Sequence, residues 1–155
     1  MSKKYHLKEN GLKITTPRLK ILNIFETSLV KHLSADDIHK RILEEKLDIS
    51  LATIYRVLSD LEEVGILVKQ HFEGGKAVFE LNNHEHHDHI ICINCGIVEE
   101  FFDERIESLQ EKVAMERGFS IKYHTLHLYV ECERTNCPHK KRESLLPQNR
   151  AQTPT

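Results

Sequence analysis

The four cysteines of this 155-residue chain fall in two short-spaced pairs, Cys92-x2-Cys95 and Cys132-x4-Cys137. Thiolates at such spacings can close a tetrahedron around Zn(II), and a shell of four sulfurs leaves no open position for chemistry. The pattern therefore predicts a structural zinc site. Redox-active dithiols or an iron–sulfur cluster are the alternatives that the same residues allow.

A second group of candidate ligands is a run of histidines: His84, His86, His87 and His89 lie within six residues, interleaved with acids. In an extended segment, His86 and Asp88 would face one way, and His87 and His89 the other. One segment can thus supply two sites with N and O ligands, which suit Fe(II), Mn(II), Co(II) and Zn(II). The alternative is a solvated polar hinge.

The same run also matches HxHxDH, the signature of metallo-β-lactamase-fold hydrolases, which would make the chain an enzyme. Those folds need a long αββα sandwich and further ligands far downstream. Only 66 residues follow His89, and they hold the cysteine pairs. We therefore expect that this chain is not an enzyme.

The elements ahead of these ligands have the order of a winged helix-turn-helix. Apolar residues at helical spacing predict helices over 17–29, 34–46 and 50–64. Two β-rich runs, 66–72 and 76–81, then flank a Glu-Gly-Gly turn and predict a hairpin.

The second half reads as a small α+β unit. Two strands are expected over 89–94 and 97–102, a helix over 104–117 and one long strand over 119–132. A unit of about 50 residues is marginally stable alone, so it needs a metal ion, a partner chain or both.

Composition limits the classes of protein to consider. No apolar run approaches the ~20 residues that a membrane span needs, and the N-terminus lacks the apolar core of a signal peptide. We therefore expect a cytoplasmic protein with reduced thiols. The net charge of -2 conceals a basic end, because residues 1–33 carry seven Lys or Arg against two acids. A basic end favours contact with a polyanion, although a solvated arm is the alternative.

The third predicted helix is the one that would enter the major groove of DNA. Arg56 lies opposite its Leu/Ile stripe and can reach guanine or phosphate, while Tyr55 can pack on a thymine methyl group. Lys13 and Arg18 can meet the DNA backbone or the minor groove. An ordinary amphipathic surface is the alternative.

Long segments of the chain resemble the ferric uptake regulator family over about residues 7–137. These segments are GLKITTPRLKIL, HLSADDIHKRI, SLATIYRVLSDLEEVGIL, FEGGKAVFEL and HHDHIICINCG, in this order. The resemblance implies a homodimeric, iron-responsive transcriptional repressor that binds AT-rich palindromic operators in double-stranded DNA.

The resemblance also implies roles for individual residues. The structural zinc ligands would be Cys92, Cys95, Cys132 and Cys137. The sensor ligands would be His32, Glu80, His87, His89 and Glu100. A further metal site in the dimerisation domain would use His86, Asp88, Glu107 and His124. The DNA contacts would be Tyr55 and Arg56 of the recognition helix and Lys13 in the minor groove.

The two glutamates of the sensor set favour an iron sensor, because peroxide-sensing members usually have Asp where this chain has Glu80 and Glu100. The expected cofactors are a structural Zn(II) and a regulatory Fe(II), for which Mn(II), Co(II) or Zn(II) can substitute. Zinc, manganese and peroxide sensors of the same superfamily are alternatives. A constitutive zinc-ribbon protein that binds nucleic acid without sensing metal is a more distant one.

These expectations together define an α+β fold with two domains. We predict an N-terminal winged helix-turn-helix DNA-binding domain over 1–83 and a C-terminal α/β dimerisation domain with a four-cysteine zinc site over 84–139. A hinge is expected at about 82–86 and a disordered tail over 140–155. The expected assembly is a homodimer or a tetramer made of two dimers.

Overall fold

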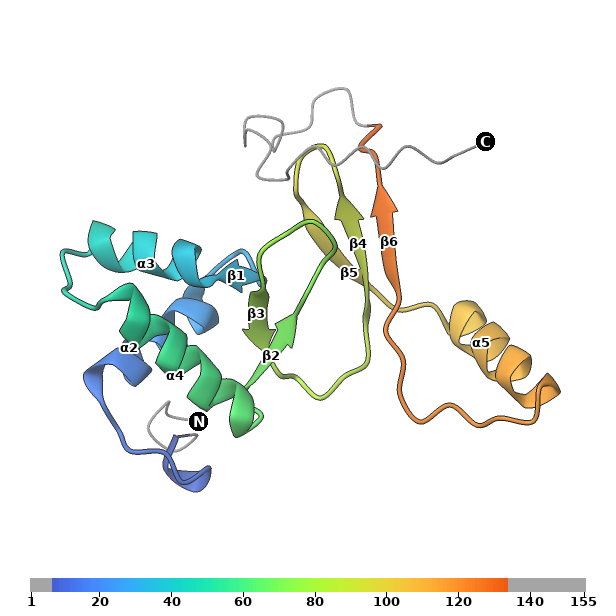
Figure 1. The fold of residues 1–155 in the computed structure, drawn as a ribbon, viewed down its shortest axis with the longest axis horizontal. Helices are drawn as coiled ribbons and strands as arrows, with labels where there is room; N and C mark the ends of the chain where they lie inside the picture. Colours follow the sequence, from blue (N-terminus) through green and yellow to red (C-terminus); the bar gives the residue numbers. More distant parts are fainter. Residues whose placement is uncertain (1–6, 134–155) are drawn as a thin grey trace. The chain divides into compact units, whose positions relative to one another are not determined.

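The chain divides into two compact units, Met1–His84 and Glu85–Thr155 (Figure 1). The structure is a computed structural model, and residues 7–133 are the ones it describes. The division falls within the segment 82–86, where the hinge is predicted. Cys137 and the tail 140–155 lie outside the described residues. Within residues 7–133, no helix is long and apolar enough to cross a membrane.

Three helices of the first unit each begin at a hydroxyl side chain that caps the helix. They are α2 (Thr16–Thr27), α3 (Ala35–Glu44) and α4 (Leu51–Glu63). At α3, Ser34 Oγ accepts from the Asp37 backbone N–H at 3.1 Å, and Asp37 Oδ2 accepts from the Ser34 N–H at 2.9 Å. An aspartate therefore closes the capping box that more often contains glutamate.

A small antiparallel sheet completes the first unit. Its strands are β1 (Leu33–Ser34), β2 (Leu67–Gln70) and β3 (Val78–Leu81), in the order β1-β3-β2. The hairpin of β2 and β3 was predicted, and it turns through Gly74 at a φ of 72°. The two-residue strand β1 was not predicted, because so short a segment shows no alternation.

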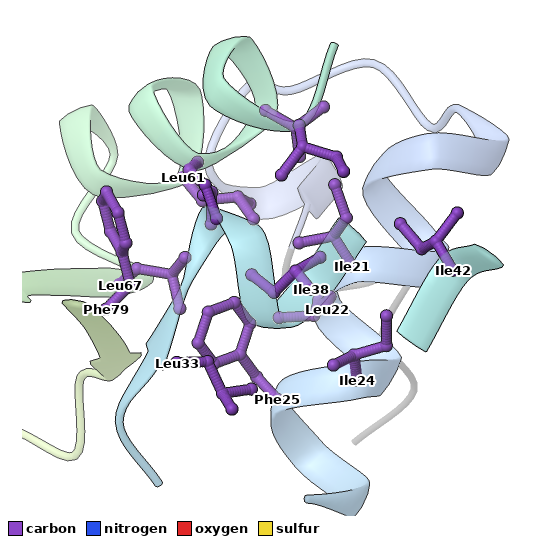
Figure 2. Packing of buried hydrophobic residues seen from close by; sticks show 14 of the residues in the cluster. Ile21, Leu22, Ile24, Phe25, Leu33, Ile38, Ile42, Leu61, Leu67 and Phe79 are labelled. Carbon is purple, nitrogen blue, oxygen red and sulfur yellow. The ribbon is translucent and has the colours of Figure 1, made fainter. Parts of the chain in front are cut away.

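The core of the first unit lies between the three helices and this sheet. Figure 2 shows Ile21, Phe25 and Ile38 among the apolar side chains that pack together there. Ile38, Ile54 and Leu58 have no exposed surface. Full burial of each such side chain stabilises the fold by about 1.5–3 kcal/mol, so this unit has an apolar core of its own.

Over its described residues, 85–133, the second unit is a three-stranded sheet with one helix. Its elements are β4 (Asp88–Cys92), β5 (Val98–Phe101), α5 (Glu104–Glu116) and β6 (His127–Val130). The strand β4 is central: β5 pairs with it antiparallel, and β6 pairs with it parallel (Figure 1). The α+β class and the order of the elements agree with the prediction.

The prediction of one long strand over 119–132 was wrong, because only His127–Val130 is a strand. The partner strand β4 begins at Asp88, and residues before 126 would continue past that end. Leu126 marks the limit, since its carbonyl accepts from the His89 N–H at 3.0 Å and its own N–H donates to Asp88 Oδ1 at 3.2 Å.

The helix α5 begins at Asp103, whose Oδ1 accepts from the Arg105 backbone N–H at 2.9 Å. Hydrogen bonds from the Arg105 side chain and backbone lower the pKa of Asp103 to about 2. No residue of α5 is buried within the chain, and its apolar residues Leu109 and Val113 are exposed. An apolar face of this kind is available to a second protein surface.

Candidate metal centres and nucleic-acid interface

Three of the four predicted zinc ligands gather at one end of the second sheet. Cys92 ends β4, and the chain turns back through Cys95, with the Gly96 N–H donating to the Cys92 carbonyl at 2.9 Å. Cys92 pairs with Val130 in the parallel register, so Cys132 follows at the same end of the sheet. Cys92 and Cys95 are buried, and Cys132 packs against them. The fourth predicted ligand, Cys137, lies outside the described residues.

The surroundings of Cys92 favour its thiolate. Burial alone would raise the pKa of this thiol. Hydrogen bonds from the backbone of Cys95, Asn94 and Cys132 and from the Cys95 side chain outweigh burial and lower the pKa. Since the thiolate is the form that binds a metal, this environment suits a zinc ligand.

The residues predicted for the additional metal site come together within the second unit. Ligand atoms of His86, Asp88, Glu107 and His124 all lie within 4.8 Å of one another. His86 Nε2 is 3.4 Å from both Asp88 Oδ1 and Glu107 Oε1, and His124 Nε2 is 3.3 Å from Glu107 Oε2. Ligands held 2.0–2.2 Å from a shared ion lie about 3–3.5 Å apart, which matches these spacings.

Polar atoms in this cluster also fit a cation. Asp88 is fully buried, and its Oδ2 has no hydrogen-bond partner among the described residues. Glu107 Oε1 and His124 Nε2 are also buried atoms that have no hydrogen-bond partner among the described residues. A buried carboxylate oxygen without a hydrogen-bond partner is costly, and a bound divalent cation would remove that cost.

In the first unit, two of the predicted sensor residues form a buried pair. His32 precedes β1 and Glu80 lies on β3, and the register of Leu33 with Phe79 brings them together. His32 Nε2 is 3.1 Å from Glu80 Oε2. Gln70 on β2 donates to the other oxygen of Glu80 at 2.9 Å, a contact that sequence reasoning missed because it depends on strand register.

The other three predicted sensor residues lie together in the second unit. His89 on β4 pairs with Glu100 on β5, and His87 Nε2 is 4.0 Å from Glu100 Oε1. The rings of His87 and His89 have centroids 5.0 Å apart. His127 on β6 pairs with His89, with ring centroids 5.6 Å apart. Sequence reasoning missed His127, since parallel pairing with a strand 38 residues away leaves no local pattern.

The predicted DNA contacts of α4 lie on its open face. Tyr55 is 53% exposed and Arg56 is exposed, whereas Ile54 and Leu58 of the same helix are buried in the core. Lys13, in the segment before α2, is also exposed. The exposed side chains can therefore reach a ligand without disturbing the core.

Arg18 differs from these residues, because its guanidinium is bound within the protein. Its Nη2 donates to Asp60 Oδ2 at 2.5 Å, and its Nη1 donates to the Lys13 backbone carbonyl at 3.0 Å. The residue thus connects the segment before α2 with the helix α4.

Three helices followed by a β-hairpin form a winged helix. Because the third helix has an exposed face, this winged helix is of the DNA-binding kind. Sulfur, nitrogen and oxygen ligands gather at several places along the same chain. The two features together define the class, a metal-binding regulator of transcription with a winged-helix domain.

Comparison with known proteins gives the family. The model of the ferric uptake regulator family matches residues 9–129. A ferric uptake regulation protein of Cupriavidus metallidurans is 54% identical over 136 residues, which cover 88% of this chain and 95% of that protein. The chain belongs to the ferric uptake regulator family.

Solved structures agree with this assignment. The ferric uptake regulator of Vibrio cholerae has a TM-score of 0.78 at 43% identity, covering 84% of this chain and 100% of that one. The ferric uptake regulator of Pseudomonas aeruginosa with manganese has a TM-score of 0.71 at 42% identity, covering 86% and 100%. Both cover the two units of the chain, so the resemblance of the sequence extends to the fold.

Proposed function

We propose that this protein is an Fe(II)-responsive repressor that binds operator DNA as a homodimer and controls genes of iron homeostasis. The observation that carries the proposal is the buried His32–Glu80 pair in the first unit, together with the cluster of His87, His89 and Glu100 in the second. A protein that used metal only for folding would have no need of nitrogen and oxygen ligands beyond its cysteine site. Reduced thiolate ligands support a cytoplasmic location.

The structural ion is Zn(II), held by Cys92, Cys95, Cys132 and Cys137. Three of these residues stand at the ends of β4 and β6 or in the turn after β4. A four-sulfur shell leaves no position for substrate or water, so this ion supplies stability. It would hold β6 against β4 within the second unit.

The regulatory ion is Fe(II), and its ligands are His32, Glu80, His87, His89 and Glu100. The first two belong to the first unit, and the other three belong to the second. An ion that shares ligands from both units favours one arrangement of the two. If DNA binds that same arrangement, metal and DNA strengthen each other's binding, with a typical coupling of about 1–3 kcal/mol.

The affinity of these nitrogen and oxygen ligands does not select Fe(II) over other divalent metals. Zn(II) and Cu(II) bind most sites of nitrogen and oxygen more tightly than Fe(II), so the supply of free metal in the cell must decide. Mn(II), Co(II) and Zn(II) can therefore substitute for Fe(II) in a test. More distant solved neighbours include a zinc-bound manganese uptake regulator and a Campylobacter jejuni peroxide stress regulator, at 33% and 28% identity. A zinc, manganese or peroxide sensor thus remains the alternative.

The additional site, His86, Asp88, Glu107 and His124, has all four ligands inside the second unit. An ion there joins the start of β4, the helix α5 and the segment before β6. This ion can stabilise the second unit. Because it has no ligand in the first unit, it cannot change the orientation of the first unit.

For DNA, the proposed contacts are Tyr55 and Arg56 on α4, together with the exposed Lys13 before α2. Arg18, which charge alone predicted as a fourth contact, has its guanidinium bound to Asp60 and to the Lys13 carbonyl. Two copies of α4 in a dimer would meet successive major grooves, about 34–36 Å apart, which requires a palindromic operator. We propose that the exposed apolar side chains of α5, Leu109 and Val113, contribute to the dimer. Sedimentation with and without DNA distinguishes the dimer from a tetramer of two dimers.

The test is metal-dependent DNA binding by zinc-replete protein. Random-sequence duplexes are selected with Mn(II)-loaded protein, and the recovered duplex is then titrated with and without Mn(II). We expect an AT-rich palindrome, tight binding with Mn(II) and weak binding without it. Arg56→Ala is the matched control, because it should weaken binding while zinc content and folding stay unchanged. Equal binding with and without Mn(II) would instead identify a constitutive nucleic-acid-binding protein.

A further inference from the structure

Arg18 carries its charge where its own helix disfavours it. It lies in the first turn of α2, which begins at Thr16, and the N-terminal end of a helix dipole repels a cation. Asp60 lies in the last turn of α4, which ends at Glu63, and that end repels an anion. Each residue is thus unfavourable for its own helix, and their ion pair offsets both effects.

The contacts of Arg18 are directed into the protein. The side chain is 18% exposed, and it donates to Asp60 Oδ2 at 2.5 Å and to the Lys13 carbonyl at 3.0 Å. Its Nε is buried and has no partner among the described residues. A guanidinium has five N–H donors in a rigid planar fork, so it can hold two acceptors in a fixed relation. Here the two acceptors are the segment before α2 and the helix α4.

The two groups that Arg18 holds stand next to the proposed DNA contacts. Its bond to the Lys13 carbonyl fixes the backbone from which the exposed Lys13 side chain extends. Asp60 follows Arg56 by four residues on α4, the spacing at which side chains on one helix face meet. With Asp60 bound to Arg18, this carboxylate does not compete with DNA for Arg56.

We propose that Arg18 is a positioning residue for DNA recognition, which fixes Lys13 relative to α4 and occupies Asp60 so that Arg56 faces DNA. The inference rests on the proposed function, since it assumes that Lys13 and Arg56 meet DNA. It differs from direct contact by Arg18, which would require the guanidinium to leave both of its partners. The two roles predict different consequences when Asp60 is removed.

The experiment is a double-mutant cycle with Arg18→Gln and Asp60→Ala. Each Mn(II)-loaded variant is titrated against the selected palindromic duplex and against an unrelated duplex, and the ratio of the two affinities is the readout. General electrostatics act on both duplexes, so the ratio isolates recognition. We expect each single variant to lower the ratio by roughly 5- to 30-fold, the factor that corresponds to 1–2 kcal/mol. The double variant should be no worse than the poorer single variant.

A second cycle tests the link to Lys13. Lys13→Ala should cost much less in the Arg18→Gln background than in the wild-type background, because the segment that carries Lys13 is already misplaced. The matched control is Lys20→Gln, since Lys20 lies on the same helix but pairs with Glu45 at the end of α3 and not with a residue of α4. Its ratio should equal that of the wild type. A merely structural role for Arg18 would lower stability without coupling its effect to that of Lys13.

Zinc content and thermal unfolding are measured for every variant. If Arg18→Gln does not fold, Arg18→Lys replaces it, because a lysine can pair with Asp60 but lacks the fork that also holds the Lys13 carbonyl. Asp60→Ala with an unchanged or higher ratio would show direct contact by Arg18 and overturn the inference. Additive effects of Arg18 and Lys13 would also overturn it, while leaving the proposed function intact. A wild-type protein that selects no duplex would overturn both.

Discussion

The two units of this chain are stabilised in different ways. In its described part, the first unit has a core of sixteen buried apolar residues, most of them from the helices α2, α3 and α4 and from the sheet. In the second, the buried cluster consists of two cysteines, with Ile97, Val130 and Cys132 packed around them. Its other buried side chains include Asp88 and His89. Apolar burial holds the first unit together, whereas the buried groups of the second unit are largely candidate metal ligands.

This difference fits the proposed division of functions between the units. A winged helix must keep one shape on and off DNA, and a self-sufficient core achieves that. A unit that is proposed to bind ions can draw its stability from one of them, the structural zinc, and leave the sensor ligands to a second ion. The residues Leu109, Met115 and Phe119 of the second unit are apolar and exposed, so they are available to a second protein surface.

The largest effect should follow removal of the structural zinc. Zinc-site formation is worth about 10–16 kcal/mol in small zinc domains, which exceeds what the few buried apolar residues of the second unit can supply. Cys132→Ser should release zinc and unfold the second unit, while the first unit keeps its helices. Cys132 is only half buried, so the substitution removes little packing. Far-UV circular dichroism, hydrogen exchange and zinc analysis measure the outcome.

Chelation of zinc from the wild-type protein is the control for the serine side chain, and re-addition of Zn(II) should restore the second unit. If the zinc-free protein keeps full exchange protection in β4 and β6, the comparison between the units is wrong.

A smaller loss is expected from the core of the first unit. Leu58 on α4 is fully buried, so Leu58→Ala should cost about 2–5 kcal/mol of unfolding free energy through lost burial and the cavity it leaves. The loss should appear in urea unfolding of the first unit and leave zinc content unchanged. Ser59→Ala, at the exposed neighbouring position, is the matched control. Equal losses for the two variants would contradict the proposed core.

Most of the first unit could be predicted from sequence because its signals are local. Ser34 with Asp37 marked the start of α3, and Gly65, with a φ of 74°, followed the end of α4. The second unit was harder. Its parallel strand β6 pairs with β4 from 38 residues away, and β6 begins only where its partner β4 begins, near Asp88. No periodicity within 119–132 encodes that limit.

The candidate sites likewise include residues that local spacing predicts and residues that only packing brings together. Residue types and spacing indicated the cysteine site and the two faces of the histidine run. The joining of His86 and Asp88 with Glu107 and His124 depends on how α5 and the segment before β6 pack. The family resemblance gave that set, and spacing alone could not. Arg18 was predicted from charge as a DNA contact, and its pairing with Asp60 became visible only in three dimensions.

The next effect concerns which ion carries the signal. Only the His87 and His89 set is proposed to share its ion with the first unit, so His89→Ala should abolish or strongly weaken Mn(II)-activated DNA binding. His124→Ala should keep most of the response, because its ion braces the second unit alone, and it should lower stability modestly. His89→Ala should remove a coupling free energy of about 1–3 kcal/mol between metal binding and DNA binding. DNA affinity against Mn(II) or anaerobic Fe(II) measures it.

Zinc content is checked in parallel, so that loss of the structural ion is not mistaken for loss of sensing. If His124→Ala silences the response and His89→Ala does not, the two ligand sets have been given each other's roles. Equal loss in both variants would mean that the sites act as one coupled unit.

The smallest effect should follow removal of a helix cap, and it should differ between the two units. Ser34→Ala removes the cap of α3, whose Ile38 and Ile42 lie in the core, and should lower the stability of the whole first unit by about 1 kcal/mol. Asp103→Ala removes the cap of α5, which has no buried residue within the chain, so the damage should stay local. Hydrogen exchange should then rise in the first turn of α5 alone, while urea unfolding of the first unit is unchanged. Asp103→Asn, which keeps a capping acceptor, should restore protection. A cooperative loss of the whole second unit on Asp103→Ala would show instead that α5 is a structural part of that unit's core.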